Sequence, residues 1–153
     1  MRRDSVNYTT INSAYILFGF AILYAIISPM FYFLTPLIGF CFYYLAMNFE
    51  NEDRKLENIL ILLYITFVEL NYGLFIFSFL LFFLLMYNLV LKPLKESIID
   101  RWILKIIFIL IAYFGYYIFN HFLGNIFNFQ TQGISWGYLV FIASDLFLVF
   151  LLL

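Results

Sequence analysis

Charged residues are scarce in this sequence, and their scarcity excludes most soluble proteins. Only 11% of its 153 residues are Asp, Glu, Lys or Arg, whereas 66% are hydrophobic and the mean hydropathy is +1.01. An ordinary soluble domain has about 25% charged and about 45–50% apolar residues. Disordered chains, which need low hydrophobicity and high net charge, are excluded as well. The composition therefore predicts an integral membrane protein.

Thiols, imidazoles and clustered basic residues are also nearly absent. The one cysteine, Cys41, lies in an apolar stretch, and no CxxC motif exists for redox or metal chemistry. The net charge is −1, without the basic cluster that nucleic-acid binding needs. HExxH and Walker motifs are missing too, and the one histidine, His121, is too little for a metal site. We therefore expect no catalytic activity, no cofactor and no metal.

Long apolar stretches dominate the rest of the chain. A membrane-spanning helix needs about 20 apolar residues, within a range of roughly 17–25. Polar segments at 50–57 and 92–101, a break at Ser28-Pro29 and a turn at Asn71-Tyr72-Gly73 divide the chain into stretches of that order. These lack the alternation of barrel strands, so we predict an all-α, polytopic membrane protein with a single domain over 1–153. About six short transmembrane helices are expected, at 11–27, 31–49, 56–70, 74–91, 102–123 and 134–153.

The positive charges predict the orientation in the membrane. All eight Lys and Arg residues lie in the N-terminal segment, in 50–57, or in 92–101 and at its edge. Six spans put these segments on one side, and cytoplasmic loops carry the excess of Lys and Arg. Both termini are therefore expected in the cytoplasm, and the uncharged loop 124–133 on the other side.

Two acidic residues, Glu69 and Asp145, lie inside apolar stretches. An Asp at the centre of a membrane helix costs about 2.5–3.5 kcal/mol to insert, so such residues usually face a bundle interior or a cavity. No Lys or Arg lies at similar depth, so we expect these acids to be protonated or bonded to Asn, Ser, Tyr or backbone groups. Asp145 is expected near the middle of its helix and Glu69 near an end, within reach of headgroup water. Asn in place of Asp145 is expected to preserve a structural hydrogen bond.

Several roles remain open for these residues. The two acids could form a proton or cation relay, recognise a partner helix, or make buried polar contacts between helices. Asn120 and His121 are candidate polar contacts of the outer loop. Asp145 with His121 is the one conceivable acid–base pair for an enzyme acting on lipid, and the two are expected at different depths.

Three features of the chain occur together. Pro29 and Pro36 punctuate the first helical pair, Glu69 near the end of the third stretch is followed by Gly73, and the basic stretch 92–101 follows the fourth. With the small size, the six short helices and the lack of an enzymatic motif, this pattern resembles the rod-shape-determining membrane protein MreD family.

The resemblance implies a non-catalytic scaffold or adaptor of the bacterial cell-shape and peptidoglycan elongation machinery, in the cytoplasmic (inner) membrane. Its partners would be lipids, MreC-like, RodA-like and penicillin-binding proteins, and MreB filaments. Its fold would be similar to the substrate-binding subunits of energy-coupling-factor transporters. Glu69, Asp145 and Gly73 would be partner-contact or buried polar residues. The alternative is a substrate-binding or ion-coupled transport subunit for a small molecule, with both acids in a pocket.

Overall fold

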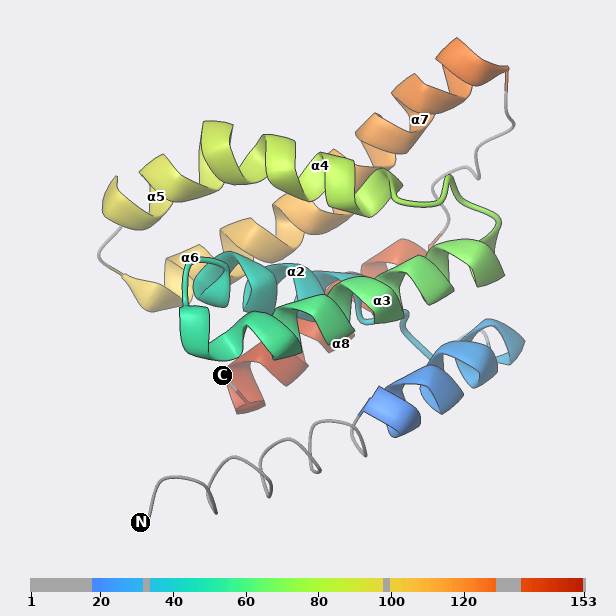
Figure 1. Cartoon of the computed structure of the whole chain (residues 1–153), viewed down its shortest axis with the longest axis horizontal. Helices are drawn as coiled ribbons and strands as arrows, with labels where there is room; N and C mark the ends of the chain where they lie inside the picture. Colours follow the sequence, from blue (N-terminus) through green and yellow to red (C-terminus); the bar gives the residue numbers. More distant parts are fainter. Residues whose placement is uncertain (1–17, 32–33, 98–99, 129–135, 153) are drawn as a thin grey trace.

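The computed structural model describes residues 18–31, 34–97, 100–128 and 136–152, which form a bundle of helices (Figure 1). Helices make up 87% of these residues, and no strand occurs among them. The predicted all-α class is therefore confirmed. The elements are the helix Phe18–Met30, α2 (Ile38–Asn48), α3 (Lys55–Tyr72), α4 (Ser78–Met86), α5 (Lys92–Ser97), α6 (Arg101–Leu110), α7 (Tyr116–Phe127) and α8 (Gly137–Leu152).

Two π-helical turns join shorter helices into long ones. Tyr87–Leu91 links α4 to α5, and Ile111–Gly115 links α6 to α7. The resulting helices Ser78–Ser97 and Arg101–Phe127 have 20 and 27 residues, and both are long and apolar enough to cross a membrane. The other apolar helices are shorter. With 11 residues, α2 is about 16 Å long at about 1.5 Å per residue, or about half of a hydrocarbon core of about 30 Å.

The second predicted helix begins later than expected. It was expected over 31–49, but α2 starts only at Ile38. Pro36 disfavours a helical conformation at the residue before it, and Leu37 has a left-handed backbone with φ of +53°. The described residues before α2, 34–37, therefore form a non-helical strap.

Other helix ends also differ from the predictions. The segment 92–101, expected to be a loop, is helical as far as Ser97. Pro93 lies inside the helix Ser78–Ser97, directly after the π-helical turn Tyr87–Leu91, which already interrupts the regular hydrogen bonding to which proline cannot donate. The helix predicted over 102–123 continues to Phe127, where Asn128 ends it in a left-handed conformation. The turn predicted at Asn71-Tyr72-Gly73 is confirmed only at Gly73, which ends α3 with φ of +63°. Asn71 and Tyr72 still belong to α3, and the next helix begins at Ser78 rather than at residue 74. Residues 11–17 of the first predicted span lie outside the described residues.

Phenylalanine rings form the centre of the bundle. Phe42 of α2 is fully buried, and its ring centroid lies 6.0, 5.8 and 5.6 Å from those of Phe79, Phe82 and Phe83 of α4. Gly115 lets the long helix Arg101–Phe127 approach this cluster, because a Cβ atom there would lie 2.8 Å from Cζ of Phe82. The ring packing thus fixes α2, α4 and the π-helical turn Ile111–Gly115 against one another.

Charged side chains meet at one end of the bundle. Nζ of Lys92 lies 3.2 Å from Oε1 of Glu50, which joins the two charged segments 50–57 and 92–101. Lys92 also lowers the pKa of the Glu50 carboxyl through this hydrogen bond. Lys95 donates a hydrogen bond of 2.9 Å to the backbone oxygen of Ala46 in the last turn of α2. A lysine at this position favours the helix because the C-terminal end of a helix carries partial negative charge.

Candidate functional site

The side chain of Asp145 caps the N-terminus of another helix. Asp145 lies in α8 and is 0% exposed. Its Oδ2 accepts hydrogen bonds from the backbone N–H groups of Gly39 and Phe40, at 2.8 and 3.1 Å. These residues belong to the first turn of α2, whose N–H groups have no partner within the helix. The hydroxyl of Thr35 donates to Oδ1 at 3.0 Å, and that of Tyr113 donates to Oδ2 at 2.8 Å.

Tyrosines bind the carbonyl groups of the non-helical strap 34–37. The hydroxyl of Tyr24 donates to the backbone oxygen of Thr35 at 2.8 Å, and that of Tyr64 donates to the backbone oxygen of Pro36 at 3.1 Å. An unpaired backbone group costs several kcal/mol in a hydrocarbon environment. Hydroxyl groups from other helices therefore satisfy the backbone carbonyl groups of this irregular segment. Asp145 satisfies the backbone N–H groups at the start of α2 in the same way.

Glu69 caps a second helix in the same way. Glu69 lies in α3 and is 1% exposed. The expectation that its carboxyl group reaches headgroup water is therefore wrong. Its Oε2 accepts from the N–H group of Phe77 at 2.8 Å, and its Oε1 accepts from that of Phe79 at 2.6 Å, both at the start of α4. The hydroxyls of Ser78 and Tyr116 lie 2.7 and 2.8 Å from Oε1.

The two caps have the same set of hydrogen-bond partners. Each carboxylate meets two backbone N–H groups, one Ser or Thr hydroxyl and one Tyr hydroxyl. In both, the residue before the capped helix is left-handed, Leu37 with φ of +53° and Phe77 with φ of +65°. Because every partner is a donor, the arrangement suits an ionised carboxylate, which only accepts.

Both tyrosines come from one helix, at its π-helical turn. Tyr113 lies within Ile111–Gly115, and Tyr116 is the first residue after it. Single π-helical turns occur often at functional sites because they change the direction of side chains. Here the turn directs one hydroxyl to Asp145 and the other to Glu69.

The remaining predicted residues lie apart from one another. Asn120 is buried and belongs to the Glu69 cluster rather than to an outer loop, since its Oδ1 accepts from the hydroxyl of Ser78 at 3.2 Å. His121 is exposed, and its ring stacks on Tyr117 at a centroid distance of 6.1 Å, so the structure does not bring it to the buried Asp145. Gly73 is exposed and forms a turn, with its N–H group donating to the backbone oxygen of Leu70.

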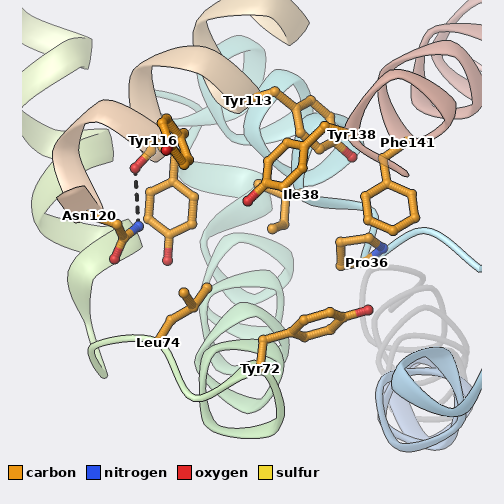
Figure 2. A pocket seen from close by; sticks show the side chains of 10 residues that line it. Pro36, Ile38, Tyr72, Leu74, Tyr113, Tyr116, Asn120, Tyr138 and Phe141 are labelled. Carbon is orange, nitrogen blue, oxygen red and sulfur yellow. Dashed lines mark hydrogen bonds between the residues drawn. The ribbon is translucent and has the colours of Figure 1, made fainter. Parts of the chain in front are cut away.

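A cavity of about 70 Å³ adjoins both clusters. Figure 2 shows Tyr72 and Leu74 facing Ile38 and Tyr138 across it, with Tyr116 at one side. Its wall carries five tyrosines and one amide, from Tyr72, Tyr113, Tyr116, Tyr117, Tyr138 and Asn120. Tyr113 and Tyr116 thus face the cavity while their hydroxyls bind the two carboxylates.

Four residues of the caps were not identified from the sequence: Thr35, Ser78, Tyr113 and Tyr116. A weak signal existed for the first two, because Ser and Thr are preferred at the beginnings of helices. Tyr113 and Tyr116 are three residues apart and therefore neighbours on a helix, but nothing in the sequence relates them to Glu69 and Asp145.

Metal-ligating side chains are not clustered in the described part of the chain. No group of three or more His, Cys, Asp or Glu residues there could hold a metal ion. The chain matches no protein-family model, no curated protein and no solved structure. A functional proposal must therefore rest on the sequence pattern and on the geometry of the caps.

Proposed function

We propose that this protein is a non-catalytic membrane scaffold of the MreD type, which acts in bacterial cell-wall elongation through its helix surfaces. One observation carries the proposal: both buried acids, Glu69 and Asp145, are occupied by capping α4 and α2. A carboxylate that holds two backbone N–H groups and two hydroxyls is suited to fix helix positions. It is poorly suited to pass protons or cations, which requires exchangeable partners.

A bilayer position is supported by the outer surface of the bundle. Large apolar side chains are exposed on several helices, among them Leu89 at 68%, Ile118 at 65% and Phe147 at 65%. Contiguous apolar surface in a soluble monomer would promote association, whereas lipid tails or partner helices cover it in a membrane. We propose that six helices lie in the inner membrane, two of them long enough to cross it and the shorter ones completed by their connections.

The proposed orientation places the charged end in the cytoplasm. Glu50 and Lys92 join the two charged segments there, as cytoplasmic loops of one protein would be joined. Cysteine labelling tests this directly, because the native Cys41 is buried. In intact cells, an impermeant thiol reagent should label Asn125→Cys but not Glu96→Cys, both at exposed positions. Labelling of Glu96→Cys alone would reverse the orientation.

Partner capture tests the scaffold function. The tagged full-length protein is crosslinked in its native membrane and purified, and its partners are identified by mass spectrometry. A tagged, unrelated polytopic protein of similar abundance serves as the control. MreC-like, RodA-like or penicillin-binding proteins enriched over the control are the expected result. Enrichment of an ATPase together with a coupling membrane subunit, without any of those partners, would overturn the scaffold in favour of a transport subunit.

A further inference from the structure

The tyrosine-lined cavity has no role in the proposed scaffold, and its chemistry points to a ligand. It lies toward the ends of α3 and α8 that are farthest from the charged segments, since Tyr72 ends α3 and Tyr138 is near the start of α8. Tyr113 and Tyr116 reach it from the middle of the helix Arg101–Phe127. None of the ten described residues that line it carries a basic or acidic group. The wall is therefore aromatic and formally neutral.

Two buried carboxyl groups lie directly behind this neutral wall. Tyr113 donates its hydroxyl hydrogen to Asp145, and Tyr116 donates to Glu69, each at 2.8 Å. A phenol that donates to a carboxylate gains electron density in its ring, which strengthens the attraction of the ring face for a cation. The described Lys and Arg side chains begin α3 and α6 or end the helix Ser78–Ser97, away from the cavity. No described Lys or Arg side chain thus lines the cavity, and the acidic groups nearest its wall are Asp145 and Glu69.

The volume limits the group that enters. A cavity of about 150 Å³ holds one benzene molecule, and this one has about 70 Å³. It therefore encloses about half of such a molecule, so a small head group would enter it only in part, with its remainder outside. Recognition of methylated ammonium groups by aromatic side chains is the main functional use of cation–π attraction.

We propose that this cavity binds the ammonium or methylated ammonium group of a small amine or of a lipid headgroup. Tyr138 and Tyr72 would supply ring faces, because Figure 2 shows them on opposite sides of the cavity. Asp145 and Glu69 would supply the charge from behind Tyr113 and Tyr116. This inference is independent of the scaffold proposal, since it requires only the described cavity.

Thermal stabilisation of the purified full chain in detergent is the first test. Choline chloride is compared with 3,3-dimethyl-1-butanol, its uncharged isostere, at matched ionic strength. A ligand that binds only the folded state raises the apparent melting temperature with concentration. Choline should do so and the isostere should not. Equal shifts for both, or no shift with choline and tetramethylammonium, would overturn the proposal.

Substitutions of Tyr138 distinguish cation–π attraction from simple filling of the cavity. Tyr138→Phe keeps the ring face and should keep the choline affinity within about twofold. Tyr138→Leu should weaken it by about 2- to 30-fold, the range expected from one such contact. Equal affinity in the Leu variant would remove Tyr138 from the site, and Tyr72→Leu then tests the opposite wall. The comparison of choline with its isostere on the natural sequence decides the outcome if a variant does not fold.

Measurements in nanodiscs distinguish a lipid headgroup from a free amine as the source of the ammonium group. The choline shift is measured in phosphatidylglycerol alone and in mixtures with phosphatidylethanolamine. A shift that disappears with phosphatidylethanolamine identifies the lipid headgroup as the occupant, because it competes for the same cavity. A shift that is unchanged identifies a free amine.

Discussion

Tyr113 and Tyr116 lie one helical turn apart and donate hydrogen bonds of the same length, 2.8 Å, to carboxylates of two different helices. Asp145 reaches the first from α8, and Glu69 reaches the second from α3. Each carboxylate also holds the N-terminus of a third helix, so the helix Arg101–Phe127 is connected through these bonds to four others, α2, α3, α4 and α8. The predictions below test whether these bonds determine the stability of the fold.

Amide substitution should distinguish the two caps. Oδ1 of Asp145 faces only the hydroxyl of Thr35, which can turn and accept from an amide NH₂ group, so Asp145→Asn should lose less than about 1 kcal/mol. Oε2 of Glu69 faces the N–H group of Phe77, which cannot accept, so Glu69→Gln should lose about 1–3 kcal/mol. The free energy of unfolding in mixed detergent, followed by helical circular dichroism, measures both. A larger loss for Asp145→Asn than for Glu69→Gln would contradict the geometry.

Gly39 should not tolerate even a methyl group. A Cβ atom there would lie 2.8 Å from Cε2 of Tyr113 and 3.0 Å from Oδ2 of Asp145. Gly39→Ala should therefore destabilise the protein by about 1–3 kcal/mol through overpacking at the cap. Gly19→Ala is the matched control, because nothing lies within 4 Å of its Cβ position and Ala favours a helix over Gly by up to about 1 kcal/mol. Melting temperatures should fall for the first and stay or rise for the second.

The tyrosine hydroxyls should each contribute measurably. Tyr113→Phe and Tyr116→Phe remove one hydrogen bond to a charged group and should each lose about 1.5–3 kcal/mol. The control is Tyr117→Phe, whose ring is half-buried in the same cavity wall and whose loss should stay below about 0.5 kcal/mol. Chemical denaturation of the three variants side by side decides this. Equal losses at all three positions would show that the effect comes from the cavity wall and not from the caps.

Lys95 should stabilise the opposite end of α2. Its Nζ lies 2.9 Å from the backbone oxygen of Ala46, so Lys95→Met should lose about 0.3–1 kcal/mol. Lys55→Met removes an exposed ion pair with Glu52 instead and should change stability by less. Unfolding curves at low and high salt provide the measurement. Identical losses for the two lysines would mean that Lys95 acts only as a surface charge.

Features that depend on one helix alone could be predicted from the sequence. Contacts between two helices could not. Apolar stretches between polar segments predicted the all-α class, and Gly73 predicted a turn, because these depend on local composition and backbone conformation. The acids were identified by the cost of burying them. Their partners were not, because a cap supplied by a distant helix leaves no local spacing: Asp145 is 106 residues from Gly39. The late start of α2 follows from Pro36 and from the left-handed backbone of Leu37, which the length of the apolar stretch does not show.

This separation has a consequence for biogenesis. Asp145 lies 106 residues after Gly39, so the ribosome delivers the cap of α2 long after it has made α2 itself. Until then, the N–H groups of Gly39 and Phe40 must be met by water, lipid headgroups or an insertion factor. The helix α2 therefore reaches its final place only after α8 has been made and docks beside it.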